Sequence, residues 1–152
     1  QFTSGTYQVS ESKPHNIYLC EAPTTFNNFA FEVKMDMIQG DCGGFIFRDD
    51  GSHGKTYTFR VCQNGCYDLY RFTDNNNSTI LNSASSCLST LPSGQNTIAV
   101  EANGSTLSVY INEQRVGSAG DSTYSQGYIG LIAEDESNTT EVTYSDARVW
   151  RL

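Results

Sequence analysis

The sequence is poor in positive charge, histidine and proline, and it contains no long apolar run. Nine Lys and Arg stand against 17 Asp and Glu, which gives a formal net charge of −8. This balance argues against nucleic acid as a partner and against an anionic membrane surface, because both require clustered cations. No stretch approaches the roughly 20 apolar residues of a membrane span, so we expect no direct membrane insertion.

Helical periodicity is also missing, whereas a period of two is frequent. In residues 29–38 the apolar Phe29, Phe31 and Val33 alternate with mostly polar neighbours, which is typical of a half-buried strand. Further strands are expected at residues 6–10, 43–48, 56–62, 67–72, 96–102, 106–111, 127–133 and 141–150. Turn-forming pairs such as Asn64-Gly65 and Asn103-Gly104 lie between them. The pattern predicts an all-β chain folded as a two-sheet antiparallel β-sandwich.

The chain has the length of one domain, and 38% of its residues are hydrophobic, which is enough to form a core. We expect a single domain over residues 1–152. Within it, residues 1–25 form an N-terminal strand and an irregular segment, and residues 26–152 form the main sandwich.

Two predicted hairpins give a register and a face. Pairing residues 43–48 with residues 56–62 places Phe45 opposite Phe59 on a core face, and Cys42 opposite Cys62 on the other face. A two-residue turn at Asn64-Gly65 then places Phe59 opposite Tyr70. With this register the non-core face carries the side chains of Arg48, Arg60, Tyr67, Leu69 and Arg71.

Five cysteines lie within the first 87 residues, without a Cys-x-x-Cys pair. The register favours a Cys42–Cys62 disulfide, since opposed residues of an antiparallel pair lie close enough for one. Cys66–Cys87 is the second choice, with Cys62–Cys66 as a competing short-loop pair. Cys20 is then left free or paired with another chain. Cysteine enrichment, scarce lysine and abundant hydroxyl side chains favour an oxidising, extracellular compartment.

The C-terminal half carries a recognisable pattern: Leu107-Ser-Val-Tyr-Ile-Asn112, then Gly127-Tyr-Ile-Gly130, then a last strand that ends in Arg148-Val-Trp150. It resembles the concanavalin A-like lectin/glucanase superfamily, in particular its laminin-G-like and keto-disaccharide-hydrolase-like branches, over residues 26–152. The resemblance implies a jelly roll. It also implies an extracytoplasmic module of a larger membrane-anchored protein, as in bacterial receptor-like Ser/Thr kinases.

No catalytic motif is found. The catalytic pattern of the resembling glucanases is Glu-x-Asp-x-x-Glu, whereas here Glu32 and Asp36 lie four residues apart with Lys34 between them. A neighbouring lysine keeps carboxyl pKa values low, which is the opposite of what a general acid needs. No cofactor and no metal site are expected. Calcium at Asp49-Asp50 or at Glu134-Asp135-Glu136 has no supporting loop motif.

Binding is the function that remains. Sugar sites combine aromatic side chains with planar hydrogen-bonding groups, and the predicted non-core face offers Arg48, Arg60, Tyr67 and Arg71. Pairing of these arginines with the chain's own carboxylates is the competing interpretation. We expect a non-catalytic recognition or sensor module for a carbohydrate or another small polar ligand. The alternatives are a carbohydrate-active enzyme that uses Glu32 and Asp36, and a structural or protein-interaction domain.

Overall fold

The computed structural model describes residues 2–3, 6–13, 16–74, 76–83, 87 and 93–152. All of its regular elements are strands. They are β1 (Phe2–Thr3), β2 (Thr6–Glu11), β3 (Asn16–Phe26), β4 (Phe29–Gln39), β5 (Cys42–Asp49), β6 (Thr56–Cys62), β7 (Tyr67–Asp74), β8 (Asn77–Ser83), β9 (Gln95–Asn103), β10 (Thr106–Ile111), β11 (Gln114–Gly120), β12 (Gly127–Asp135) and β13 (Thr140–Arg151). Within the described residues no helix has the length and apolar character needed to cross a membrane.

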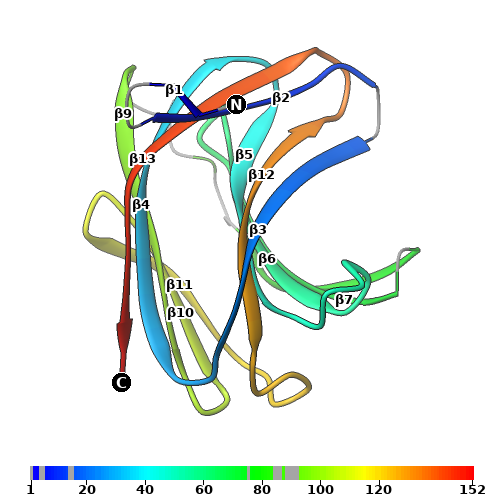
Figure 1. The fold of residues 1–152 in the computed structure, drawn as a ribbon, viewed down its shortest axis with the longest axis vertical. Helices are drawn as coiled ribbons and strands as arrows, with labels where there is room; N and C mark the ends of the chain where they lie inside the picture. The colour runs from blue at the N-terminus through cyan, green and yellow to red at the C-terminus, as the bar shows by residue number, and fades with distance from the viewer. Residues whose placement is uncertain (1, 4–5, 14–15, 75, 84–86, 88–92) are drawn as a thin grey trace.

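The strands form two antiparallel sheets that pack face to face, as Figure 1 shows nearly edge-on. One sheet has the order β1-β2-β13-β4-β9-β10-β11, and the other has the order β3-β12-β5-β6-β7-β8. The all-β sandwich expected from the period-two pattern is confirmed. Alternation directs one row of each strand into the space between the sheets, which is why the pattern is a good guide to the core.

Aromatic residues dominate that core. Phe45 of β5 contacts Phe31 of β4 edge to face at a centroid distance of 5.1 Å, and it lies 5.5 Å from Phe59 of β6. Phe47 stacks on Tyr57 at 5.3 Å. All five side chains are buried, so this layer joins the two sheets at their centre.

The β5–β6 register matches the prediction, with Cys42 opposite Cys62 and Phe45 opposite Phe59. Disulfides join Cys42 to Cys62 and Cys66 to Cys87, which are the two pairs that the sequence analysis favours. Cys20 on β3 is free and exposed.

Four strands lie outside the predicted ranges: β1, β3, β8 and β11. In particular, residues 16–25 fall in the part expected to hold an irregular segment, but with residue 26 they form β3, which pairs with β12. Each of the four occupies an edge of a sheet. An edge strand hydrogen-bonds on one side only and tolerates polar residues or a proline, so its sequence lacks the alternation of an inner strand.

Candidate functional site

The turn between β6 and β7 decides which side chains face outward from the six-stranded sheet. The backbone N–H of Cys62 donates to the Cys66 carbonyl at 2.8 Å, and the Gly65 N–H donates to the Cys62 carbonyl at 2.8 Å. Gly65 has a φ of 78°. The turn therefore has three residues, Gln63-Asn64-Gly65, and its glycine takes the left-handed conformation that this loop length requires. The expected two-residue turn is wrong by one residue.

That single residue reverses the faces of β7. Phe59 lies opposite Leu69 and not Tyr70, and Arg60 lies opposite Asp68. Leu69 and Tyr67 point into the core, while Asp68 and Tyr70 take the outer face beside Arg60. The face that was predicted for Tyr67, Leu69 and Arg71 is corrected accordingly.

Of the four predicted ligand residues, only Arg60 lies on the outer face of the sheet. Tyr67 is 8% exposed, and its hydroxyl donates to the Val116 carbonyl on β11. Arg71 forms an ion pair with Asp121 in the segment between β11 and β12, and it donates to the Thr123 hydroxyl at 3.0 Å. Tyr67 therefore links the two sheets, and Arg71 holds the segment that follows β11.

Arg48 also leaves the predicted face, because it has a φ of 52° at the end of β5 and is 1% exposed. Its guanidinium donates at 2.9–3.2 Å to the carbonyl oxygens of three loop residues: Asn27, Gly104 and Tyr124. All its contacts are internal, so the structure gives Arg48 a loop-fastening role at one end of the sandwich.

Arg60 is the centre of a charged group on the outer face, which we call the Arg60 cluster: Arg60, Asp68, Tyr70, Glu134 and Glu136. Nη1 of Arg60 lies 2.9 Å from Glu134 and 2.7 Å from Glu136, and Nη2 lies 3.1 Å from Asp68. The guanidinium also covers the Tyr70 ring, at 4.9 Å from its centroid. The Tyr70 hydroxyl donates to Asp68 at 3.2 Å.

Burial and charge act against each other in the Arg60 cluster. Burial would lower the pKa of Arg60, but the attraction of Glu134 and hydrogen bonds to Glu134 and Asp68 outweigh it, so the pKa is raised. Burial raises the pKa of Glu134, although the charge of Arg60 acts in the opposite direction. With side-chain exposures between 15% and 19% for Arg60, Asp68 and Glu134, these groups are shielded and yet within reach of a ligand.

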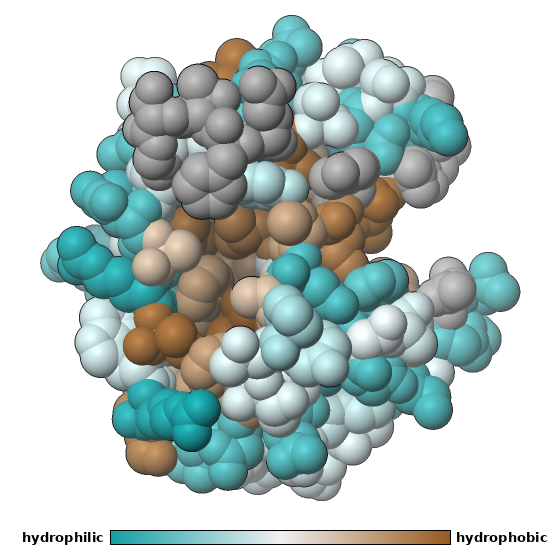
Figure 2. All heavy atoms as spheres, in the orientation of Figure 1, coloured by the Kyte–Doolittle hydropathy of each residue, from teal (hydrophilic) through white to brown (hydrophobic). Residues whose placement is uncertain are grey.

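The outer face of the six-stranded sheet is hollowed. Figure 2 shows a notch in the surface on the side where Figure 1 places β3 above and β6 and β7 below. The positions next to Arg60 on this face are small or apolar. Gly44 of β5 lies beside Arg60 of β6, and Ile132 of β12 lies on the other side of Gly44. A Cβ at Gly44 would lie 2.1 Å from the Phe59 carbonyl, so only glycine fits there.

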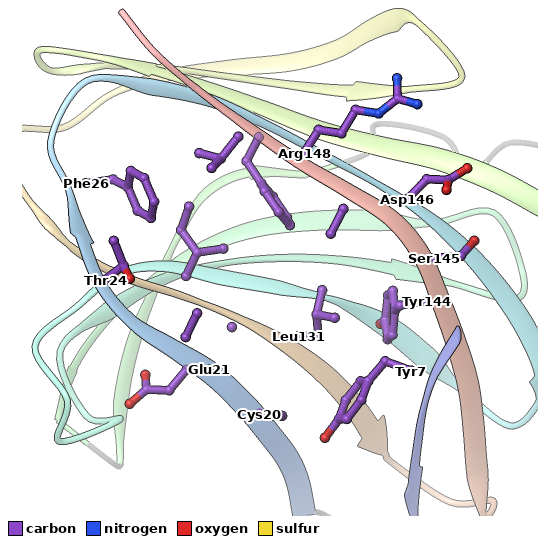
Figure 3. Close-up of a pocket in the computed structure, with 16 residues that line it drawn as sticks. Tyr7, Cys20, Glu21, Thr24, Phe26, Leu131, Tyr144, Ser145, Asp146 and Arg148 are labelled. Atoms are coloured by element: carbon purple, nitrogen blue, oxygen red, sulfur yellow. The ribbon is translucent and has the colours of Figure 1, made fainter. Parts of the chain in front are cut away.

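A second depression lies at the open edge of the sandwich, between β3 and β12 on one side and β2 and β13 on the other. It has a volume of about 630 Å³ and a mostly apolar lining. In Figure 3, Leu131 and Tyr144 lie in its interior, whereas Glu21, Asp146 and Arg148 lie at its periphery. This edge cavity offers few polar groups for a sugar.

The carboxylates considered for catalysis lie elsewhere. Glu32 and Asp36 sit on the outer face of β4 in the seven-stranded sheet, where Glu32 lies 3.6 Å from Arg148. Lys34 between them pairs with Asp146 at 2.5 Å. The Arg60 cluster belongs to the other sheet, so the structure does not bring Glu32 and Asp36 to it.

Sequence reasoning identified Arg60 but missed its partners. Glu134 and Glu136 were considered for calcium and not as partners of Arg60, and Tyr70 was assigned to the core. Strand alternation places Asp68 and Tyr70 on the same outer face as Arg60, and Glu134 lies on that face at the end of β12, with Glu136 just beyond the strand. A correct turn length would have placed Asp68 and Tyr70 beside Arg60.

No family model matches the chain, and no curated protein matches it. Solved structures do resemble it. Carbohydrate-binding module CBM66 from Bacillus subtilis superposes with a TM-score of 0.78 at 16% identity, covering 95% of this chain and 94% of that one. Sheep galectin-11 in complex with glycerol gives a TM-score of 0.64 at 11% identity, covering 91% and 100%.

A third similar structure is the κ-carrageenase of Pseudoalteromonas carrageenovora in complex with an oligotetrasaccharide of κ-carrageenan, with a TM-score of 0.61 at 12% identity over 88% and 67% of the two chains. At these identities the likeness concerns the fold. The receptor-kinase context implied by the resemblance finds no support among these structures. The chain has the jelly-roll fold of the concanavalin A-like lectins and glucanases.

Proposed function

We propose that this chain is a non-catalytic, extracellular carbohydrate-binding module, and that it binds sugar at the Arg60 cluster. The observation that carries the proposal is the group of three carboxylates that one guanidinium holds on the outer face of the six-stranded sheet. The similar structures add support, since they include a carbohydrate-binding module, a galectin and an enzyme with a bound oligosaccharide.

The Arg60 cluster suits the hydroxyl groups of a sugar because its carboxylates keep free acceptor positions after they bind Arg60. The N–H groups of Arg60 are engaged by Asp68, Glu134 and Glu136, which fixes the orientation of these carboxylates. Each ionised carboxylate has about four acceptor positions, so free positions remain to accept hydrogen bonds from a ligand. Charge-assisted hydrogen bonds of this kind are among the strong ones.

The charge of the cluster points to a class of sugar. Three carboxylates surround one guanidinium, and the chain as a whole carries a net charge of −8. Sulfated or uronic sugars would meet repulsion from a surface that already has excess negative charge. A neutral sugar, which donates through its hydroxyls, is the ligand class that fits.

Calorimetry against a panel of neutral and anionic polysaccharides tests the proposal. We expect binding to at least one neutral glycan, and an affinity loss of roughly tenfold or more, equivalent to about 1.4 kcal/mol, in Arg60→Lys and Tyr70→Ala. Arg115→Ala on the exposed part of β11 is the matched control and should bind like the unmodified chain. Unchanged binding in both site variants, or binding to no glycan of the panel, would count against the site.

An enzyme is the second candidate. Burial raises the pKa of Glu134, as a general acid needs, although the ion pair with Arg60 at 2.9 Å acts in the opposite direction. A reducing-end assay on the same panel separates the two functions. Turnover that disappears in Glu134→Gln would establish hydrolysis at the Arg60 cluster. Turnover that disappears in Glu32→Gln would instead locate it on the seven-stranded sheet. Absence of turnover with binding retained supports the non-catalytic module.

A further inference from the structure

A second polar cluster lies at the opposite end of β5 from the Arg60 cluster. It combines Glu21 of β3, Asp49 at the end of β5 and His53 in the segment that leads to β6. His53 Nδ1 lies 3.4 Å from Asp49 Oδ2 and 3.7 Å from Glu21 Oε2, and one potential ligand atom of each residue lies within 4.8 Å of the others. We call these three residues the Glu21 triad.

Two oxygens of the triad are buried without a hydrogen-bond partner among the described residues: Asp49 Oδ1 and Glu21 Oε2. The Asp49 side chain is completely buried, and its other oxygen accepts a hydrogen bond from the Gly51 N–H at 2.7 Å. A buried carboxylate oxygen without a donor is costly, and two carboxylates side by side also repel each other. A cation bound between the two carboxylates, or a proton shared by them, would offset both costs.

A glycine on the intervening strand makes room for this arrangement. Gly130 of β12 lies between Glu21 of β3 and Ile46 of β5 in the register of the sheet. A Cβ at Gly130 would lie 2.6 Å from Leu19 Cδ1 and 2.9 Å from Glu21 Cβ. Without that Cβ, the Glu21 side chain is free to occupy the surface of the sheet beside Asp49.

We propose that Glu21, Asp49 and His53 bind one divalent transition-metal ion of the zinc type. Carboxylate oxygen and imidazole nitrogen are zinc ligands at about 2.0–2.2 Å, so two ligand atoms of a tetrahedral site lie about 3.3–3.6 Å apart. The 3.4 Å between His53 and Asp49 lies within this spacing, and the 3.7 Å between His53 and Glu21 lies 0.1 Å above it. The ligand atoms of Glu21 and Asp49 lie within 4.8 Å of each other. Three protein ligands leave the fourth position to water. Calcium prefers six to eight oxygens, whereas this set contains a nitrogen.

Calorimetry on the whole chain after dialysis against EDTA tests the site, with ZnCl₂, MnCl₂ and CaCl₂ as separate titrants at neutral pH. We expect one Zn²⁺ ion per chain, with Mn²⁺ and Ca²⁺ bound more weakly. His53→Gln and Asp49→Asn should each weaken Zn²⁺ binding by at least about tenfold. His15→Gln changes the other histidine of the chain and should leave the affinity unchanged.

The outcomes separate a metal from a shared proton. Zn²⁺ should raise the Tm of the unmodified chain and leave that of His53→Gln unchanged. The His53 side chain is 51% exposed, so its substitution does not threaten folding and decides the matter even where Asp49→Asn is unstable. Equal affinity in His53→Gln and the unmodified chain would overturn the proposal. So would tighter binding of Ca²⁺ than of Zn²⁺, or a Tm that rises on acidification in EDTA and does not respond to Zn²⁺.

Discussion

At the scale of single residues, the four side chains proposed for ligand binding have three different roles. Arg60 is surrounded by carboxylates on the outer face of its sheet, Tyr67 and Arg71 link β7 to β11 and to the segment after it, and Arg48 is internal. Arginine on a strand is ambiguous because its long side chain reaches carbonyls, carboxylates or ligands equally well. What distinguishes the roles is the set of acceptors within reach.

Arg48 provides a prediction at this scale. Arg48→Lys keeps the charge but loses the planar fork that donates to Asn27, Gly104 and Tyr124. Because the substitution leaves buried carbonyl groups without a donor, it should lower the free energy of unfolding by about 2–4 kcal/mol, as measured by urea denaturation. Arg115→Lys at an exposed position is the control. An Arg48→Lys variant with unchanged stability and impaired glycan binding would return Arg48 to a ligand site.

At the scale of elements, the inner strands and the edge strands carry different information. Phe29, Phe31, Val33 and Met35 alternate along β4, and all four are buried. The edge strand β8 is exposed over most of its length and has no such alternation. Inner strands are therefore predictable from period alone, whereas an edge strand forms because a neighbour offers it unpaired backbone groups.

In the connection between β12 and β13, the carboxylate of Asp41 stabilises the turn that follows β12. Asp41 accepts the backbone N–H groups of Glu136, Ser137 and Asn138 at 2.7–2.9 Å, and Nδ2 of Asn138 donates to it as well. Burial acts to raise the pKa of Asp41, but these hydrogen bonds outweigh it and lower the pKa to about 2.

Asp41→Asn should lower the free energy of unfolding by about 1–2 kcal/mol at neutral pH, since it removes the charge that these donors stabilise. The pKa is lower in the folded state than its ordinary value of 3.8. The stabilisation is therefore complete above that ordinary value and disappears as the pH falls towards about 2. Urea denaturation at several pH values checks this, with the exposed Glu101→Gln as control. A difference from the unmodified chain that stays constant down to pH 2 would contradict the assignment.

At the scale of the whole molecule, the two sheets are stabilised differently. All five cysteines lie on or next to strands of the six-stranded sheet, which holds both disulfides, both polar clusters and the hollow of Figure 2. The seven-stranded sheet contributes mainly the opposite wall of the core through β4, β9 and β10. The sheet that we propose to bind ligand is thus also the covalently braced one.

Removal of the Cys42–Cys62 disulfide tests that bracing. The bridge closes a sequence separation of 20 residues, so replacing both cysteines by alanine should cost about 3 kcal/mol, because the unfolded chain gains conformational freedom. At this chain length the corresponding fall in Tm is roughly 6–12 °C. Cys20→Ser, at an exposed free thiol, should leave the Tm unchanged. A Cys20→Ser variant whose Tm falls as far as that of the double variant would contradict this account.

The sequence by itself determined the inner strands, the aromatic core and the Cys42–Cys62 pairing, because alternation and close turns record burial between residues that are neighbours along the chain or across one hairpin. Only the tertiary structure decided where the edge strands form and which side chains of β7 face outward. It also decided that Arg60 contacts Glu134 and that Glu21 lies close to Asp49. These depend on the order of strands in the sheet and on a single residue of turn length, and a shift of one residue moves every side chain of a strand to the other face.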